Sequence, residues 1–332
     1  MTKINYDIAL IGNAIVDIIA QTSDRMLKEL LIEKGAMQII DAEKADDLLK
    51  IIDNPIIVSG GSAANTAVGF SSFGGIACFL GQTGSDEFGT LFEKNINEAG
   101  VFFQRKQNNN LFEKTSKSII LVSPDAERSM STFLGASIDF NINCVNEELI
   151  INSNILYIEG YLFDQPEAKK AIYHCCRIAK EKNIQIALSL SDLFCVERHR
   201  KDFLSLISEF IHIVFANEAE LKSLYQMDFS SCINKLKEVV TIGAITLGSK
   251  GSLIFKNGLE YNINANKIEN LVDTTGAGDL FAAGFLYGFS KSLSIDNCGS
   301  LGTKAASEII TYYGARPKIL LKNLLSWNIY FV

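Results

Sequence analysis

A short turn near the C-terminal end of the chain carries residue types suited to phosphoryl transfer. It reads DTTGAGD at positions 273–279 and runs directly into an apolar stretch with helical spacing. Backbone N–H groups at a helix N-terminus, backed by the helix macrodipole, form a site for anions, and glycines let a phosphate approach closely. A carboxylate at Asp279 would be odd in a site that only holds phosphate. It suits a base that takes the proton of an attacking hydroxyl.

The same turn also has a purely structural interpretation. Thr274 or Thr275 could be the N-cap of the following helix, and the macrodipole would favour Asp279 in its first turn. Short glycine-rich turns before helices are common, so the turn alone does not decide between the two interpretations. They are compatible, because a cap would also hold the site rigid.

Other nucleotide-binding and metal-binding patterns are weak or absent in the sequence. Gly84 and Gly89 have the glycine spacing of a Walker A loop, but Thr90 stands where a lysine is needed. No dinucleotide fingerprint follows a strand, since the glycines of the 276–278 turn run into Phe281. The three histidines form no ligand cluster and the seven cysteines no Cys-x-x-Cys pair, so protein-ligated zinc is not expected.

Composition indicates a globular protein of the cytoplasm. The 332 residues are 48% hydrophobic and 21% charged, and the net charge of −7 argues against a general binder of nucleic acid or anionic membranes. Asp7 interrupts the segment that would be the apolar region of a signal peptide, and no run of about 18 apolar residues occurs. Scattered cysteines, odd in number, are typical of buried thiols in a reducing compartment. We therefore expect a cytoplasmic location without a membrane or nucleic-acid partner.

From residue 154 onward, predicted strands alternate with predicted helices, and these elements must position the 273–279 turn. Apolar runs of buried-strand length alternate with helical stretches, which favours a parallel sheet covered on both faces. The strand-like runs are 155–158, 184–189, 211–216 and 240–247, and the helical stretches are 166–182, 196–210 and 218–225. Runs at 251–255 and 259–262 predict a hairpin at the sheet's edge. Strand-like pieces within the first 135 residues predict an accessory sheet, in a chain that forms one domain.

Two separated motifs resemble the signatures of the ribokinase-like, or PfkB, family of carbohydrate and nucleoside kinases. DTTGAGDLFAAGF at 273–285 resembles the C-terminal signature, and GGSAANTA at 60–67 resembles the N-terminal one. The resemblance covers nearly the whole chain. Within the family the chain is most similar to bacterial adenosine kinase-like proteins, through residues 12–17, 132–136, 191–196 and 215–220.

The resemblance implies a three-layer α/β/α fold with a central, mostly parallel sheet. A small β-sheet lid would receive its strands from about residues 13–41 and 101–134, and the rest of residues 1–332 would form the large α/β core. Relatives are monomers or pair through the lid as homodimers, and the sequence does not separate these states.

The resemblance also assigns roles to individual residues at the acceptor end. Asp279 would be the base, with the amides of Gly276, Ala277 and Gly278 around the transferring phosphoryl group. The other matching positions contact the acceptor or, in the case of the arginine, the phosphates; they are Asn13, Asp17, Gly60, Gly61, Asn65 and Arg128. Asp17 would accept hydrogen bonds from two hydroxyls. Ser62 stands where ribokinases proper often have lysine, which argues against ribose as the acceptor.

A second set of matching residues lies at the nucleotide end. The family's Asn-x-x-Glu motif, here Asn217 and Glu220, organises Mg²⁺ and phosphate, often through water, and the same pair could form a capping box. The turn with Thr246, Gly248 and Gly251 would hold the nucleotide's ribose and base. Relatives hold a monovalent cation through backbone carbonyls near positions matching Asp273 and 306–316, which makes K⁺ a candidate ligand.

These observations predict ATP-dependent phosphoryl transfer to a hydroxymethyl group, with ATP and Mg²⁺ as ligands. Adenosine or a related nucleoside is the favoured acceptor. The alternatives are a sugar or sugar acid of the fructose, ribose or 2-keto-3-deoxygluconate type, and a ligand-binding pseudokinase without turnover. Closure of the lid would exclude water, which competes with the acceptor for the phosphoryl group.

Overall fold

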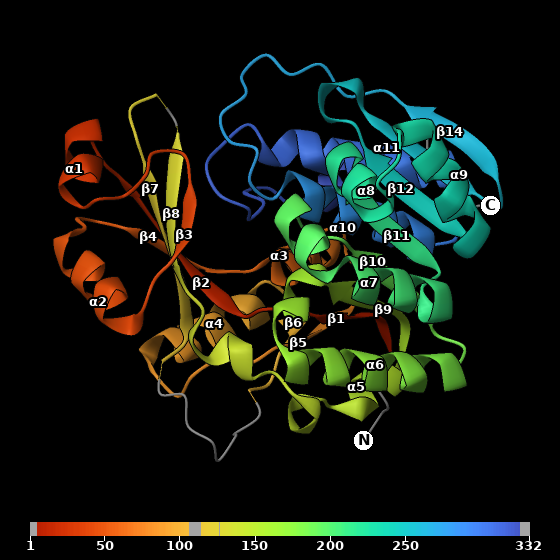
Figure 1. The fold of residues 1–332 in the computed structure, drawn as a ribbon, viewed down its shortest axis with the longest axis horizontal. Helices are drawn as coiled ribbons and strands as arrows, with labels where there is room; N and C mark the ends of the chain where they lie inside the picture. The colour runs from red at the N-terminus through yellow and green to blue at the C-terminus, as the bar shows by residue number, and fades with distance from the viewer. Residues whose placement is uncertain (1–4, 106–113, 126, 326–332) are drawn as a thin grey trace.

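Two β-sheets organise the computed structural model, which describes residues 5–105, 114–125 and 127–325. In these residues the larger sheet has nine strands in the order β14-β13-β12-β11-β10-β9-β1-β5-β6, and the smaller has five in the order β3-β8-β7-β2-β4 (Figure 1). The strands are β1 (Tyr6–Ile11), β2 (Ile15–Gln21), β3 (Met37–Ile39), β4 (Ile56–Gly60), β5 (Ala77–Leu80), β6 (Val101–Phe102), β7 (Ser116–Val122), β8 (Arg128–Phe133), β9 (Ser153–Glu159), β10 (Gln185–Ser189), β11 (Ile213–Asn217), β12 (Ile242–Thr246), β13 (Ser252–Lys256) and β14 (Leu259–Ile263).

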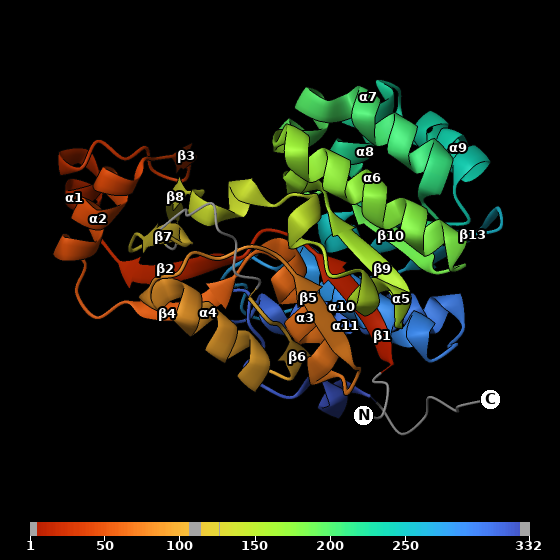
Figure 2. The same cartoon turned by 90° about the horizontal axis from the view of Figure 1, so that it is seen from below.

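Helices cover both faces of the large sheet (Figure 2). The helices of the described residues are α1 (Asp24–Glu29), α2 (Ala42–Ile51), α3 (Ser62–Ser72), α4 (Glu87–Glu98), α5 (Glu147–Ile151), α6 (Pro166–Glu181), α7 (Leu193–Phe210), α8 (Glu218–Tyr225), α9 (Phe229–Val239), α10 (Ala277–Ser290) and α11 (Ile295–Ile309). One face packs against α3, α10 and α11, and the other against α6 to α9. The predicted three-layer α/β/α arrangement is confirmed.

The alternation of side chains along each strand explains why the strands read as continuous apolar runs. In β1, Ile8 and Leu10 belong to the core with α3 and α10, whereas Ala9 and Ile11 belong to the core with α6 and α7. Successive side chains of a strand point to opposite faces, and both faces here are covered. The strands from β12 through β9 and β1 to β6 pair in parallel. The predicted hairpin, β13 and β14, is antiparallel and forms one edge.

The small sheet lies beside the large one, with α1 and α2 on its far side (Figure 1). Its strands come mostly from the two predicted regions, but the structure differs in two places. β4 pairs antiparallel with β2 in the small sheet, although residues 56–60 were not predicted to contribute. β6 pairs parallel with β5 in the large sheet, although residues 101–102 were predicted in the lid. Short apolar runs do not reveal which sheet they join, because both sheets offer them a half-buried edge.

Several helix ends also differ from the predicted ones. α7 begins at Leu193 because the Asp192 carboxylate accepts a hydrogen bond from the Cys195 amide and so caps the helix. The sequence also predicts a helix over 295–313, whereas α11 ends at Ile309. α9 was not predicted at all. No helix in the described residues combines the length and the apolarity that crossing a membrane requires.

Candidate active site

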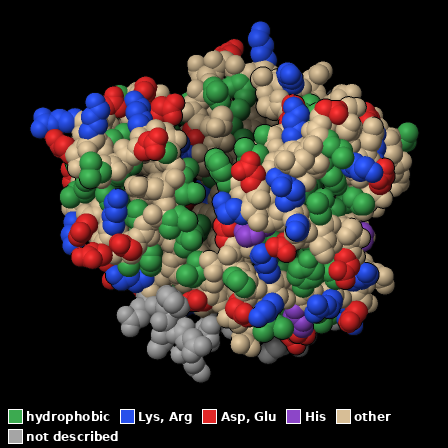
Figure 3. Space-filling view, viewed as in Figure 1, with side chains coloured by type: hydrophobic (Ala, Val, Ile, Leu, Met, Phe, Trp, Pro, Cys, Tyr) green, Lys and Arg blue, Asp and Glu red, His purple; other side chains and the backbone are tan. Residues whose placement is uncertain are grey.

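A cavity of about 450 Å³ lies between the small sheet and the carboxyl ends of the large-sheet strands. Figure 3 shows the surface hollowed between the lobe of the small sheet and the rest of the molecule. Carboxyl ends of parallel strands are where α/β sheets bind ligands. Nine of the predicted site residues line the cavity, namely Asp17, Gly61, Asn65, Asn217, Glu220, Thr246, Gly276, Gly278 and Asp279. Ala277, Asn13, Gly60, Arg128, Gly248, Gly251 and Asp273 are not among its lining residues.

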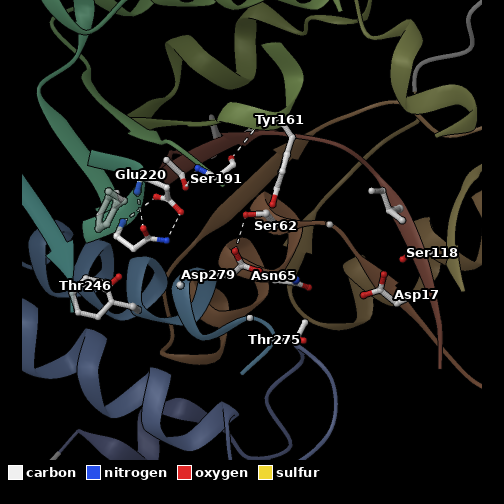
Figure 4. A pocket seen from close by; sticks show the side chains of 18 of the residues that line it. Asp17, Ser62, Asn65, Ser118, Tyr161, Ser191, Glu220, Thr246, Thr275 and Asp279 are labelled. Carbon is white, nitrogen blue, oxygen red and sulfur yellow. Dashed lines mark hydrogen bonds between the residues drawn. The ribbon is translucent and has the colours of Figure 1, made fainter. Parts of the chain in front are cut away.

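Asp279 lies at the centre of the cavity and is held by two side chains from the start of α3 (Figure 4). Ser62 Oγ donates a hydrogen bond of 2.6 Å to Asp279 Oδ1, and Asn65 Nδ2 donates one of 2.9 Å to Oδ2. Burial raises the pKa of Asp279 above its ordinary value, while these two hydrogen bonds and the charge of Arg316 oppose the rise. A carboxylate with a raised pKa is a better proton acceptor, provided that it is ionised at working pH.

The turn before α3 requires glycine at two positions. Gly61 has a φ of +96°, and a Cβ there would lie 2.2 Å from the carbonyl oxygen of Asn13. A Cβ at Gly60 would lie 2.2 Å from Asp17 Oδ2. Gly60 therefore leaves room for the Asp17 carboxylate rather than contacting the cavity itself, and Gly61 lets the chain enter α3 at the cavity wall.

The N-terminus of α10 is built without a side-chain cap. The N-cap is Gly276, with a φ of +77°, so the prediction that Thr274 or Thr275 caps the helix is wrong. The turn is held instead by Asp273, whose carboxylate accepts a hydrogen bond of 2.9 Å from the Thr275 amide. A side-chain cap would occupy N–H groups of the first turn, so the glycine start leaves these groups to a ligand.

The amides of this turn are not equivalent. The Ala277 amide donates to the carbonyl oxygen of Thr274 at 3.2 Å, which leaves it engaged within the turn. For the amides of Gly276 and Gly278, no acceptor is found among the residues that the structure describes. A Cβ at Gly278 would meet nothing within 4 Å, so this residue faces open space in the cavity. Within the anion site predicted for residues 276–278, the amides of Gly276 and Gly278 are therefore the ones left for a ligand, and the site itself stays a prediction.

Asp17 extends into the cavity from β2, on the far side of Asp279 from Glu220 (Figure 4). Burial raises its pKa to about 6; Arg316 and Arg128 oppose the rise, and Asp279 adds to it. No described residue donates a hydrogen bond to its carboxylate. A buried carboxylate without a protein donor can accept hydroxyls from a ligand.

Asn13 and Glu159 form a connection behind the cavity. Asn13 Nδ2 donates to Glu159 Oε1 at 2.9 Å, and the Ala63 amide donates to Oε2 at 2.8 Å. Burial raises the pKa of Glu159 to about 7, although these hydrogen bonds oppose the rise. Asn13 is therefore engaged with the protein rather than with the cavity, and Glu159 anchors the starts of both β2 and α3.

Asn217 and Glu220 form the predicted capping box at the start of α8. The Asn217 amide and its Nδ2 donate to the two Glu220 oxygens at 2.9 and 2.6 Å, and the Glu220 amide donates to Asn217 Oδ1 at 2.8 Å. Burial raises the pKa of Glu220 to about 7. Both residues line the cavity.

The carboxylate of Glu220 suits a magnesium ion that is held mainly by phosphates and water. No cluster of three or more His, Cys, Asp or Glu side chains with ligating geometry occurs in the described part of the chain. Mg²⁺ commonly keeps several waters and uses one or two carboxylates, so Glu220 is a suitable outer ligand. Thr246, at the end of β12, pairs with Asn217 at the end of β11. Gly248 and Gly251 shape the turn that follows Thr246, with φ of +60° and +93°.

Arg128 and Asp273 join the small sheet to the turn before α10. Arg128 Nη1 lies 2.9 and 2.8 Å from the two Asp273 oxygens; the Asp273 side chain is buried, and the Arg128 side chain is 11% exposed. Asp273 also accepts a hydrogen bond of 2.9 Å from the Gly314 amide. Arg128 was expected to contact the phosphates, but in this structure its guanidinium pairs with Asp273 instead. The predicted K⁺ site, made of backbone carbonyls, stays a prediction.

Three residues that hold or face Asp279 and the start of α3 had no role predicted from the sequence. Ser62 contacts Asp279 directly, Tyr161 points toward Ser62 across the cavity (Figure 4), and Arg316 reaches the start of α3 from the segment after α11. Ser62 could have been found, because it follows the two glycines of the N-terminal motif. Nothing in the pattern around Tyr161 or Arg316 distinguishes them from ordinary core or surface residues.

Comparison with known proteins identifies the family. The model of the pfkB family carbohydrate kinases matches residues 33–321. The chain belongs to this family. It is 42% identical to a probable sugar kinase from Rhizobium etli CFN 42, with a TM-score of 0.89 over 98% of both chains. It is 41% identical to adenosine kinase from Sinorhizobium meliloti, with a TM-score of 0.89 over 97% of this chain and 98% of the other.

More distant relatives include the adenosine kinase of Saccharomyces cerevisiae. The two are 25% identical over 330 residues, which cover 92% of this chain and 95% of the yeast protein. The protein is accordingly a PfkB-family kinase, similar to bacterial adenosine kinase.

Replacing Asp273 tests the buried ion pair. Asp273→Asn leaves Arg128 buried without a counter-charge, and we expect the free energy of unfolding to fall by about 3 kcal/mol. Burial raises the pKa of Asp273, but the Gly314 and Thr275 amides and Arg128 outweigh it, so the pKa is lowered overall. The ionised Asp273 carboxylate stabilises the folded state. This stabilisation is complete above the pKa of the carboxyl group in the unfolded chain, about 4, and is lost as the pH falls through the pKa of Asp273 in the folded protein.

Urea unfolding at pH 7 and at pH 3 provides the measurement. The difference in the free energy of unfolding between wild type and Asp273→Asn should be smaller at pH 3 than at pH 7. Glu29→Gln, which removes an exposed ion pair with Arg25, is the matched control and should cost less than about 0.5 kcal/mol. A loss in Asp273→Asn no larger than in this control would contradict the prediction.

Proposed function

We propose that this protein transfers the γ-phosphoryl group of ATP to the hydroxymethyl group of a nucleoside, with adenosine as the favoured acceptor. The observation that carries the proposal is the position of Asp279. Its carboxylate is held by Ser62 and Asn65. Asp17, which accepts no hydrogen bond from a described residue, lies on one side of it, and the Asn217–Glu220 pair lies on the other (Figure 4).

The acceptor is bound at the small-sheet end. The Asp17 carboxylate accepts hydrogen bonds from two vicinal hydroxyls of the sugar, which orients the ring and directs its hydroxymethyl group to Asp279. Ile15, Ile120 and Met130 supply apolar surface on the same side of the cavity, against which a planar base can pack. The small sheet acts as the lid, and its closure removes water that would compete for the phosphoryl group.

Asp279 acts as the general base. As the acceptor oxygen forms its bond to the γ-phosphorus, the bond from that phosphorus to the bridging oxygen breaks, ADP leaves, and the acceptor's proton passes to the Asp279 carboxylate. The hydrogen bonds from Ser62 and Asn65 fix the carboxylate's orientation. The Gly276 and Gly278 amides, with the α10 macrodipole, stabilise negative charge on the transferring group.

The nucleotide is bound at the large-sheet end. Thr246 and Asn217 lie there at the ends of neighbouring strands, and Glu220 is placed to hold Mg²⁺ through water. When bound with the nucleotide, Mg²⁺ neutralises phosphate charge. The capping box keeps the Glu220 side chain fixed, because both of its oxygens already accept hydrogen bonds from Asn217.

The choice of acceptor is supported by the similar proteins. Those from S. meliloti and S. cerevisiae are adenosine kinases, and a nucleoside uses both the diol site at Asp17 and the apolar surface beside it. The protein from R. etli is a probable sugar kinase, which makes a sugar or sugar acid the second candidate.

A panel of acceptors tests the proposed function. Purified protein with ATP and Mg²⁺ is assayed for ADP release with adenosine, other nucleosides, fructose, ribose and 2-keto-3-deoxygluconate, and without acceptor. We expect ADP with adenosine at rates well above the acceptor-free control. ADP release with sugars alone would replace the nucleoside by the second candidate, and no release with any acceptor would favour a pseudokinase.

Replacing the base tests its role. Asp279→Asn keeps the size of the side chain but cannot take a proton, so kcat should fall by about two to four orders of magnitude. ATP binding, measured by calorimetry, should persist. Asp296→Asn, an exposed aspartate in the first turn of α11, is the matched control and should keep kcat. Turnover near the wild-type rate in Asp279→Asn would remove Asp279 from the mechanism.

Replacing the diol-binding carboxylate tests the acceptor site. Asp17→Ala should raise the KM for the acceptor by about 10- to 100-fold, because hydrogen bonds to a charged group are lost. The KM for ATP is the internal control and should change little, since the nucleotide lies at the other end of the cavity. An unchanged acceptor KM would refute the role of Asp17.

A further inference from the structure

Arg316 reaches from the segment after α11 to the turn that begins α3. Its Nε donates to the Ser59 carbonyl oxygen at 2.7 Å, and its Nη2 donates to Ser59 Oγ at 3.1 Å. Its Nη1 donates to the Ala64 carbonyl oxygen at 2.8 Å. Ser59 precedes the two glycines and Ala64 follows Ser62, so the guanidinium fixes both sides of the turn that presents Ser62 to Asp279.

The charge of Arg316 has no close counter-ion. No carboxylate of the described residues lies within 4.0 Å of its guanidinium, and all three of its hydrogen bonds go to uncharged oxygens. Burial lowers its pKa to about 10, and the carboxylates that oppose this shift are Asp17 and Asp279. Asp17 and Asp279, two of the three acids that line the cavity, are thus its electrostatic partners at longer range.

The surroundings of Asp279 are otherwise acidic. The titratable groups that interact with it are Asp17 from β2, Tyr157 and Glu159 from β9, and Tyr161 from the turn after β9. Arg128 also acts on Asp17, but it is paired with Asp273. Arg316 is the cation that acts on both Asp17 and Asp279 among the described residues. Without a cation, carboxylates gathered in a buried cavity cannot all ionise at moderate pH.

We propose that Arg316 is a positioning residue for phosphoryl transfer, which holds the 59–64 turn and keeps Asp17 and Asp279 ionised at the same time. The proposal rests on the proposed function for its link to catalysis. Asp17 must be ionised to accept two hydroxyls, and Asp279 must be ionised to accept a proton. One cation that interacts with both lets acceptor binding and proton transfer operate in the same pH range.

Removal of this charge has a defined effect on the pH profile. Without Arg316 the ionised form of Asp279 is less favoured, so its pKa rises and a larger fraction is protonated at a given pH. The acid limb of kcat/KM, which reports the essential base of the free enzyme, should therefore move to higher pH. In Arg316→Gln we expect an upward shift of about one pH unit.

The experiment compares the pH profiles of wild type, Arg316→Gln and Arg316→Lys. Arg316→Lys keeps the charge but loses the forked hydrogen bonds, so its acid limb should stay near the wild-type position even where its rate is lower. Arg25→Gln, on the exposed α1, is the matched control and should reproduce the wild-type profile. An Arg316→Gln profile that is lower in rate but has an unshifted acid limb would overturn the electrostatic role.

A second measurement needs no substrate and separates failure of the inference from failure of the proposed function. Urea unfolding midpoints at pH 7 are compared for wild type, Arg316→Gln, Asp279→Asn and the double variant. If Arg316 balances the charge of Asp279, Arg316→Gln should lower the midpoint less in the Asp279→Asn background than in wild type. Equal shifts in the two backgrounds would overturn the inference. An inactive wild type with coupled midpoints would refute the proposed function alone.

Discussion

The close approach of α3 and α10 is the constraint on which the site depends. Gly69 makes this approach possible, because a Cβ there would lie 2.6 Å from Leu280 Cδ1 and 2.8 Å from Ala283 Cβ. With the two helices in contact, Ser62 and Asn65 reach the carboxylate of Asp279 at the start of α10. A buried carboxylate is unfavourable unless it accepts hydrogen bonds or has a counter-charge nearby. The helix packing and the chemistry therefore depend on the same contact.

The small sheet is attached to the turn before α10 by an ion pair as well as by apolar packing. Arg128 of β8 pairs with Asp273, which also holds the amides of Thr275 and Gly314. The same carboxylate thus contacts the small sheet, the turn before α10 and the segment after α11. Placement of the small sheet is in this way linked to the shape of the turn that carries Gly276 and Gly278.

Much of the fold could be predicted because buried strands and helices show characteristic patterns of apolar residues in the sequence. The strands from β9 to β12 read as apolar runs since both of their faces are covered, and Asn217 with Glu220 was recognisable as a capping box. The Asp17, Asn65 and Asp279 positions followed from the motifs. The sheet membership of β4 and β6 could not be predicted, because it depends on pairing with strands distant in sequence. Arg316 was missed for a similar reason: its partners Ser59 and Ala64 are 257 and 252 residues away.

The residues that surround Asp279 in the cavity lie far apart along the chain, and this separation has a consequence for folding. Ser62 and Asp279 are 217 residues apart, and Arg316, which holds the turn around Ser62 through Ser59 and Ala64, lies still farther along the chain. Contacts of such long sequence separation form late, because the entropy of closing the intervening loop must be overcome first. During synthesis, the large sheet can gain several of its parallel strands before Asp279 has been made. The cavity can therefore reach its full set of contacts only after residue 316 has been made.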